Sequence, residues 1–508
     1  MSLKKNIAAN YASQIYVTLI AIVVVPLYIK YLGVEAYGLI GFFAMLQSWF
    51  SLLDMGLTPT MARETSRYHG GALSALGYRR LVRALEGIFL LVAIIGGVGM
   101  YAGSGFIASD WLQTSKLPIA EVQLAIRDMA LIVAMRWMCG LYRGALSGAE
   151  RLVWLGGYGA VIATLRFVGV IPVLIFVGAT PTAFFHFQVA VAIFELSGLL
   201  IQAYRLFPAV PSAHGIPWSW EPLRPVLKFS LTIAFTTAVW VLVTQTDKLV
   251  LSKILPLTTY GYFTLAVLVA SGVMTISGPI SGALMPRMST LEAAGDHASM
   301  ILVYRKATQL VTVIAGSASL TLAFCAGPLL WAWTGNRVLA EHAAPVLVLY
   351  ALGNGILAVS AFPYYLQYAK GDLRLHLIGN AVFVTALIPS IIWATRRAGG
   401  IGAGYVWLAM NLLAFVAWLP FVHRRFEPGL NRPWYLHDIL LIVLPMSVAS
   451  YVTSQLTHLS DHRVPTLLAI AFSGSTTLLA GALASSQMRG LARSWRARRR
   501  STPSVFPL

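Results

Sequence analysis

Long apolar stretches recur along the whole 508-residue chain and constrain its fold more than any other feature of the sequence. Each is about 17 to 25 residues long, enough for a helix rising about 1.5 Å per residue to cross roughly 30 Å of hydrocarbon. Because lipid offers no hydrogen-bond partners, such a segment must pair its backbone polar groups internally, as an α-helix does. Hydrophobic residues make up 58% of the chain and charged residues only 11%. The sequence therefore predicts an all-α integral membrane protein.

The apolar pattern predicts about fourteen transmembrane helices. We expect them at residues 7–29, 36–58, 81–105, 123–145, 153–178, 182–204, 226–251, 260–285, 306–333, 344–368, 375–395, 401–422, 436–457 and 464–486. The segments between these helices are too short to form a soluble catalytic domain. We therefore expect the function to reside among the helices themselves.

Lysine and arginine residues are distributed unevenly between alternate connections. Of the 37 in the chain, most fall on the side that carries the N-terminus. The opposite side carries Lys30, Lys116, Lys253, Arg337, Arg396, Arg397 and Arg463. The positive-inside rule then predicts that both termini are cytoplasmic. The formal net charge of +19 comes mostly from basic residues in connections beside the membrane, where anionic lipid headgroups are the expected partners. Nucleic acid is therefore not an expected partner.

Short motifs recur in the two halves of the chain at nearly the same spacing. KYLGVEAYG, at Lys30–Gly38, matches KILPLTTYG, at Lys253–Gly261. GAERL matches GDLRL, and MAR ending at Arg63 matches MPR ending at Arg287. The spacing covers six predicted helices, an even number, so both halves insert in the same orientation and are related by an axis along the membrane normal. We expect two six-helix bundles related by a pseudo-two-fold axis, plus two extra C-terminal helices.

This repeat predicts how the chain is divided into parts. The expected parts are an N-terminal six-helix bundle at 1–205, a cytoplasmic linker at 206–225, a C-terminal six-helix bundle at 226–422, the last two helices at 423–486 and a basic cytoplasmic tail at 487–508. Parallel repeats of this kind typically enclose a substrate path and work by rocking. The tail is expected to lie on anionic lipid.

Several charged residues fall inside predicted helices, where a charge is costly unless it is paired or hydrated. Arg136, Arg166 and Glu195 each lie near the middle of a helix in the N-terminal half. Arg143 follows Arg136 by two turns and shares its helix face. Two mid-membrane arginines and one carboxylate leave net positive charge, which suits a diphosphate or acidic sugar, since the guanidinium fork binds phosphate bidentately. The alternative is a structural Arg–Glu pair, with Arg143 meeting only lipid headgroups.

Other charges are expected at the two ends of the helices. Arg127, Asp128, Asp247 and Lys248 lie near predicted outer ends, where salt bridges could form a gate or simply join helices. Sequence neighbours on a helix do not face each other, so each of these residues should find its partner elsewhere. At the cytoplasmic face, the candidate residues are Asp54, Arg63 and Arg287.

Signatures of enzymes and cofactor sites are missing from the sequence. It contains no GxSxG, HExxH, Walker or Rossmann motif and no outer Asp-x-Asp. Cys139 and Cys325 lie in apolar segments, and the histidines are too scattered to bind a metal. We expect a protein that is not an enzyme and that needs no cofactor or metal.

Four segments together resemble a known family. They are PLYIKYLGVEAYG after the first predicted helix, LLDMGLTPTMARE at the end of the second, RGALSGAERL after the fourth and TDKLVLSKILPLTTYG at the seventh. They are similar to segments of the O-antigen (Wzx-type) polysaccharide flippases of the multidrug/oligosaccharidyl-lipid/polysaccharide (MOP) exporter superfamily. The resemblance extends over essentially the whole chain.

This resemblance implies a function and a location. The expected protein is a V-shaped pair of bundles in the bacterial inner membrane that moves undecaprenyl-diphosphate-linked repeat units of O-antigen, capsule or exopolysaccharide outward by alternating access. The substrate would enter a cavity lined by Arg136, Arg143 and Arg166, and Glu195 or Asp247 would couple transport to an ion. Beyond substrate and membrane lipids, the expected partners are a polysaccharide polymerase and its chain-length regulator.

Alternatives remain open on the sequence alone. A multidrug exporter or a lipid II flippase would share the fold, although a drug exporter's cavity should be richer in carboxylates than in arginines. A membrane-embedded polymerase or glycosyltransferase would be an enzyme of another class. A channel or a major-facilitator carrier is also compatible with a helical membrane protein, but the repeat motifs favour the flippase.

Overall fold

The computed structural model describes residues 3–209, 220–458 and 462–490. Throughout these residues the secondary structure is helical, and the only β-type pairing is an isolated bridge between Gln113 and Pro256. The chain divides into two compact units, Met1–Gly261 and Tyr262–Leu508. The middle of the predicted linker and the predicted tail beyond Gly490 lie outside the described residues.

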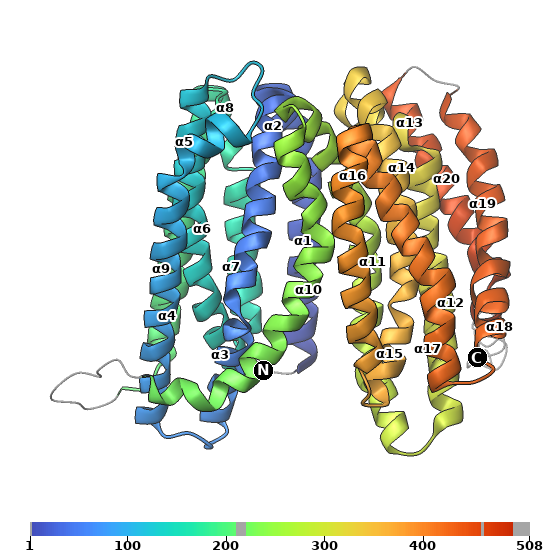
Figure 1. The fold of residues 1–508 in the computed structure, drawn as a ribbon, viewed down its shortest axis with the longest axis horizontal. Coiled ribbons are helices and arrows are strands. Elements are labelled where there is room, and N and C mark those ends of the chain that lie inside the picture. The colour runs from blue at the N-terminus through green and yellow to red at the C-terminus, as the bar shows by residue number, and fades with distance from the viewer. Residues whose placement is uncertain (1–2, 210–219, 459–461, 491–508) are drawn as a thin grey trace, which may run out of the picture. The chain divides into compact units, whose positions relative to one another are not determined.

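The first unit, coloured blue to green in Figure 1, is built of long helices joined by short ones. Its elements are α1 (Leu3–Val23), α2 (Val25–Phe50), η1 (Ser51–Asp54), α3 (Leu57–His69), α4 (Ala75–Ala102), α5 (Ser104–Phe106), η2 (Ile107–Trp111), α6 (Ile119–Gly148), α7 (Leu152–Phe167), α8 (Val170–Phe176), α9 (Pro181–Leu206), η3 (Glu221–Leu223) and α10 (Arg224–Ile254). The first turns of α11 (Leu257–Ala293) also belong to this unit, and α11 then continues into the second.

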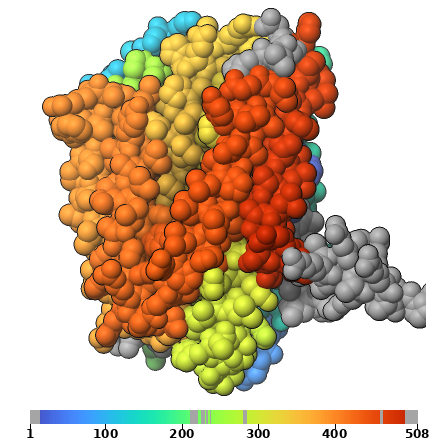
Figure 2. All heavy atoms as spheres, turned by 90° about the vertical axis from the view of Figure 1, so that its right-hand side faces the viewer, coloured from blue at the N-terminus to red at the C-terminus, as the bar shows by residue number. Residues whose placement is uncertain are grey.

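The second unit has the same character. It contains α12 (His297–Phe324), α13 (Ala326–Thr334), α14 (Arg337–Ser360), α15 (Phe362–Ala369), α16 (Arg374–Leu413), η4 (Ala414–Trp418), α17 (Leu419–Phe426), α18 (Asn431–Pro433), η5 (Trp434–Leu440), α19 (Leu441–Ser454), η6 (Gln455–His458) and α20 (Arg463–Ala484). Figure 2 shows a face on which the orange-to-red segments from α16 onward lie at the surface. On α19, Leu444, Val448 and Val452 are more than half exposed, as expected for side chains that contact lipid.

Ten helices among the described residues are long and apolar enough to cross a membrane. The prediction of about fourteen crossings stays a prediction, because two of these ten are interrupted by non-helical residues. Gly33 has a positive φ of 83° within α2, and Gly399 has one of 54° within α16. Each interruption lies between two spans that the sequence analysis places separately, 7–29 and 36–58 in one case and 375–395 and 401–422 in the other.

Small residues set the packing of α6, the most heavily contacted helix of the first unit. Gly140, Gly144 and Gly148 recur every four residues along the face that meets α3. A Cβ at Gly144 would lie only 2.5 Å from the carbonyl oxygen of Thr58, and one at Gly148 would overlap the carbonyl oxygen of Ala62. Such glycine spacing allows helix backbones in a membrane to approach closely. It fixes the rotation of α6 about its axis, and so the direction of Arg136 and Arg143, which lie about a quarter turn from the middle of this glycine face.

The two repeat motifs cross each other within the first unit. A Cβ at Gly38 would overlap the carbonyl oxygen of Leu257, and a Cβ at Gly261 would lie 2.6 Å from that of Val34. Val34 and Leu257 are the fifth residues of their motifs, and Gly38 and Gly261 are the ninth. The contact is therefore reciprocal, as in an interface with two-fold symmetry.

The position of α10 differs from the division that the repeat predicts. α10 packs against α2, α3 and η1, and the contacts within the chain group it with the first unit. The repeat instead assigns this helix to the second bundle, at 226–422. The division by repeat stays a prediction, while the compact units meet at Gly261 and Tyr262.

Candidate functional site

Three helices of the first unit bring the mid-membrane charges together. α6 carries Arg136 and Arg143, α7 carries Arg166, and α9 carries Glu195. α6 packs closely along α9, which places Glu195 opposite the arginine face of α6. We call these four residues the arginine cluster.

Glu195 is the centre of the arginine cluster, and its side chain is only 2% exposed. Its Oε1 accepts a hydrogen bond from Nη2 of Arg143. Its Oε2 lies 3.5 Å from Nε of Arg136, an ion pair without hydrogen-bond geometry. The structure thus joins both arginines of α6 to one carboxylate of α9, including Arg143, which the sequence analysis places on the same helix face as Arg136.

Arg136 is the least satisfied member of the cluster. Its side chain is only 13% exposed, and none of its three guanidinium nitrogens has a hydrogen-bond partner among the described residues. The guanidinium lies 5.7 Å from the ring centroid of Phe43, a cation–π contact. Buried polar groups are normally hydrogen-bonded, and an unsatisfied one often marks a place where an ion or ligand binds. Arg136 can therefore accept an anionic ligand without first losing a hydrogen bond.

Arg166 lies at the break between α7 and α8. Side chains satisfy the backbone carbonyl oxygens that this break releases. Gln188 Nε2 donates to the Arg166 carbonyl oxygen at 2.8 Å, and Tyr28 Oη donates to the Phe167 carbonyl oxygen at 2.8 Å. The Arg166 guanidinium interacts electrostatically with Glu195 and Arg143, and its Nε has no hydrogen-bond partner among the described residues. Two arginines therefore pair with one carboxylate, and Arg166 adds a third positive charge within electrostatic reach, which leaves a positive excess.

The predicted gate residues lie apart from the arginine cluster. Asp128 Oδ2 is 3.5 Å from His186 Nδ1, and this nitrogen also lies 2.8 Å from the Thr182 carbonyl. Arg127 turns away from this pair and donates from Nε to Ser104 Oγ at 3.3 Å. These local contacts join α6 to α9 and to α5.

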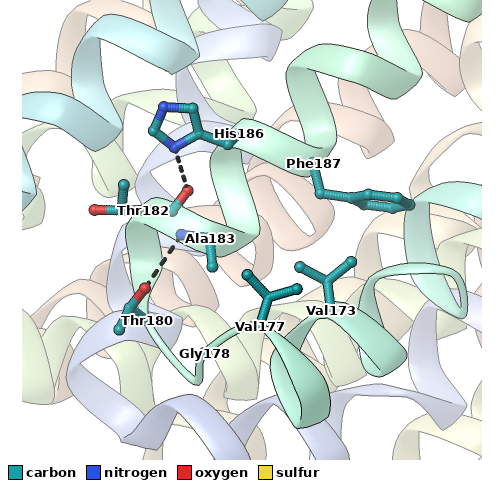
Figure 3. A pocket seen from close by; sticks show the side chains of 8 residues that line it. All are labelled: Val173, Val177, Gly178, Thr180, Thr182, Ala183, His186 and Phe187. Atoms are coloured by element: carbon teal, nitrogen blue, oxygen red, sulfur yellow. Dashed lines mark hydrogen bonds between the residues drawn. The ribbon is translucent and has the colours of Figure 1, made fainter.

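A surface pocket of about 580 Å³ adjoins His186 at the turn from α8 to α9. Figure 3 shows Val173, Val177 and Phe187 around it, with the His186 ring directed at the Thr182 carbonyl. The pocket is lined mostly by apolar groups and carries no member of the arginine cluster.

Asp247 and Lys248 contact each other, although the sequence analysis expects each of them to find its partner elsewhere. Lys248 Nζ lies 3.4 Å from Asp247 Oδ1 and also donates to the Thr244 carbonyl one turn earlier. The long lysine side chain folds back along α10, whereas the rule for neighbouring positions considers only the directions of the Cα–Cβ bonds. Asp247 additionally accepts from the Lys248 backbone N–H at 2.8 Å.

The three residues that are predicted to lie at the cytoplasmic face make local contacts. Asp54 accepts from the backbone N–H of Thr58 at 3.2 Å and from its hydroxyl at 2.6 Å, and so caps the start of α3. Arg63 donates to the buried Glu64 at 3.1 Å. Arg287 is exposed on α11 and interacts electrostatically with Asp296.

The sequence analysis missed a buried carboxylate in the second unit. Asp438 is 0% exposed and accepts from Arg305 at 2.6 and 3.0 Å and from Gln309 at 2.7 Å. Asp438 lies within the predicted span 436–457, which marks it as a charge inside the membrane. Its partner Arg305 lies just outside the predicted span 306–333, so the sequence does not indicate the pair. No group of three or more metal-ligating side chains is found in the part of the chain that the structure describes.

Comparison with known proteins identifies the family. A family model described as polysaccharide biosynthesis protein matches residues 3–292, more than half of the chain. The uncharacterized membrane protein EpsK of Bacillus subtilis is 21% identical over 365 residues, which cover 70% of this chain and 69% of EpsK.

Solved structures share the fold. A lipid II flippase MurJ, in an inward closed conformation, matches with a TM-score of 0.70 at 14% identity, over 94% of this chain and 98% of MurJ. An inward-facing multidrug resistance MATE family transporter of the MOP superfamily matches with a TM-score of 0.64 at 14% identity, over 82% and 95% of the two chains. The chain is therefore a multi-pass integral membrane protein with the MOP-superfamily fold, and it belongs to the polysaccharide biosynthesis protein family.

Proposed function

We propose that this protein is a flippase that moves undecaprenyl-diphosphate-linked oligosaccharide repeat units from the cytoplasmic to the periplasmic leaflet of a bacterial inner membrane. The observation that carries the proposal is the buried guanidinium of Arg136, which has no hydrogen-bond acceptor and lies within a cluster of excess positive charge. A buried charge in a membrane protein costs several kcal/mol unless it is compensated, so its retention favours a functional role.

The chemistry of the arginine cluster matches a diphosphate. Each phosphate of a diphosphate diester carries about one negative charge, and its oxygens accept paired hydrogen bonds from a guanidinium fork. Arg136, Arg143 and Arg166 offer three such forks around Glu195. In this proposal the cluster holds the diphosphate while the polyprenyl chain stays in lipid, and rocking of the repeat-related halves presents the glycan to the periplasm.

The family match supports a saccharide cargo, since the matching model describes polysaccharide biosynthesis proteins. The fold shared with a protein named lipid II flippase supports a lipid-linked one. The products would be O-antigen, capsule or exopolysaccharide, with a polymerase and its chain-length regulator as downstream partners. Both termini would be cytoplasmic, as the charge distribution predicts.

A lipid II flippase is the second candidate, because lipid II presents the same diphosphate headgroup to the same cluster and the MurJ fold matches over 94% of this chain. The two candidates differ in the glycan that accumulates when the protein is absent. A drug exporter is less well supported, because cationic drugs would meet three arginines and one carboxylate here.

Deletion of the gene in its host tests the proposal. We expect undecaprenyl-diphosphate repeat units to accumulate in the inner leaflet and surface polysaccharide to disappear. Complementation with Arg136→Ala or Arg166→Ala should restore less than about a tenth of the surface polysaccharide, since loss of one charged contact to a phosphate weakens binding at least tenfold. Membrane insertion of both variants should match that of the wild type on immunoblots.

The matched control is Arg151→Ala, which removes an exposed arginine from the connection between α6 and α7. It should restore surface polysaccharide fully. Repeat units accumulating in the outer leaflet would instead indicate a polymerase or ligase. Normal polysaccharide with Arg136→Ala would exclude the arginine cluster as the headgroup site.

A further inference from the structure

Glu195 occupies the place that a substrate phosphate would need. Its Oε1 accepts a hydrogen bond from Nη2 of Arg143, and its Oε2 lies 3.5 Å from Nε of Arg136. A carboxylate and a phosphate present similar oxygens to a guanidinium, and two acceptors cannot use the same N–H in the same direction. Resting on the proposed function, we infer that Glu195 is an internal competitor that sets the specificity of the arginine cluster for diphosphates over monophosphates.

The burial of the two partners indicates which one moves. The Glu195 side chain is 2% exposed, whereas that of Arg143 is 50% exposed. Arg143 can therefore swing from the carboxylate to an arriving anion, while Glu195 is held in place by the surrounding helices. The Tyr158 hydroxyl, which donates to the backbone carbonyl of Phe194 at 2.7 Å, packs directly against this part of α9.

Charge balance and the spacing of the phosphate oxygens together explain why this competition selects a diphosphate. Glu195 neutralises one of three arginines, so the cluster keeps an excess of two positive charges. A diphosphate diester brings about two negative charges and enough oxygens to reach Arg136 and Arg166 while Arg143 turns to it from Glu195. A lipid monophosphate carries a similar charge of about −1.5 to −2, but its oxygens are all on one phosphorus and reach fewer of the guanidinium groups, and it must still break the Glu195–Arg143 contact. The carboxylate thus keeps anions with a short reach out of the cluster.

Binding of short lipid phosphates to the purified full-length protein in detergent tests this inference. Glu195→Gln keeps the shape of the side chain but removes the competing charge. We expect it to bind farnesyl diphosphate about tenfold more tightly than the wild type and to bring farnesyl monophosphate into the measurable range. Glu195→Asp keeps the charge but has a shorter side chain, so its affinity for farnesyl diphosphate should lie between those of the wild type and Glu195→Gln. The same measurements with inorganic diphosphate separate recognition of the headgroup from recognition of the lipid.

A purely structural role for Glu195 predicts the opposite result. Loss of a buried ion-pair partner would then lower both the melting temperature and the affinity, whereas competition predicts a tighter complex despite a lower melting temperature. Glu64→Gln is the matched control, because Glu64 is equally buried and also pairs with two arginines, Arg63 and Arg67, but lies on α3. Its affinity for farnesyl diphosphate should equal that of the wild type.

The outcomes separate this inference from the proposed function. If Arg136→Ala binds farnesyl diphosphate as tightly as the wild type, the proposed headgroup site is wrong. If Arg136→Ala loses binding but neither Glu195 variant gains it, the site stands and the competitor role is wrong. The inference would also be overturned if Glu195→Gln bound inorganic diphosphate more tightly than the wild type but bound farnesyl diphosphate with unchanged affinity. Glu195 would then not face a lipid-linked headgroup.

Discussion

At the scale of single residues, the buried carboxylates of Asp438 and Glu195 both have arginine partners but differ in how many of the polar atoms around them are hydrogen-bonded. Asp438 receives two hydrogen bonds from Arg305 and a third from Gln309, and Gln309 accepts in turn from Ser485 at 2.8 Å. Glu195 instead leaves one oxygen, and all of the Arg136 guanidinium, without hydrogen-bond partners in the described part of the chain. Saturated networks of the first kind hold helices together, whereas the second kind keeps donors for a ligand.

Asp438→Asn should therefore reduce stability and leave headgroup binding intact. The substitution removes the charge opposite a bidentate Arg305, and we expect a loss of about 2 kcal/mol, because that arginine keeps some access to solvent. Thermal unfolding of the purified protein, followed by tryptophan fluorescence, measures the loss. The exposed Glu341→Gln in the same unit should change nothing. Equal melting temperatures for Asp438→Asn and the wild type would contradict the structural role.

Position along a helix is enough to predict that some charged residues lie near one another. Arg136, Arg166 and Glu195 are predicted to lie at one depth, and the structure brings them within electrostatic reach of one another. Contacts that depend on side-chain reach are not predictable in this way. Lys248 folding back onto Asp247 and Arg305 reaching Asp438 both come from long, flexible side chains, which helical spacing does not constrain.

At the scale of helices, close approach of backbones organises the first unit. α6 meets α3 through glycines spaced four apart, and the motif of α2 crosses the start of α11 at Gly38 and Gly261. The sequence predicts where most helices lie, because long apolar runs have few alternatives in lipid. The interruptions at Gly33 and Gly399 fall where the sequence separates two predicted spans, but the sequence does not reveal that either glycine has a positive φ.

Because the two repeat motifs cross in close contact at Gly38 and Gly261, we expect the loss of stability on glycine-to-alanine substitution to depend strongly on position. Gly38→Ala places a Cβ against the Leu257 carbonyl, which cannot move without displacing α11, and should cost about 3 kcal/mol. Gly261→Ala, its repeat-related counterpart, should behave in the same way. Gly99→Ala, in α4 with nothing within 4 Å of its Cβ, should be neutral or slightly stabilising. Melting temperatures and the yield of folded protein measure the difference, and equal values for Gly38→Ala and Gly99→Ala would contradict the crossing.

At the scale of the whole molecule, the chain combines an all-helical membrane fold with a cationic cluster inside its first unit. The fold class follows from composition and apolar run length, and the shared fold with MurJ and MATE structures agrees with it. The repeat motifs point to a duplicated chain, but the compact units meet at Gly261 and Tyr262, so that α10 groups with the first unit. The sequence could not predict this grouping, because it depends on which side of α10 is packed.

Transport of a lipid-linked oligosaccharide by the purified protein in liposomes tests the central claim most directly. Fluorescent undecaprenyl-diphosphate oligosaccharide is incorporated in the vesicles, and the fraction that reaches the outer leaflet is followed with a glycan-modifying enzyme that cannot enter them. Wild type and Arg151→Ala should equilibrate the lipid between leaflets, while Arg136→Ala should be slowed at least tenfold. Equal rates for Arg136→Ala and the wild type would contradict the claim that this buried arginine holds the diphosphate during translocation.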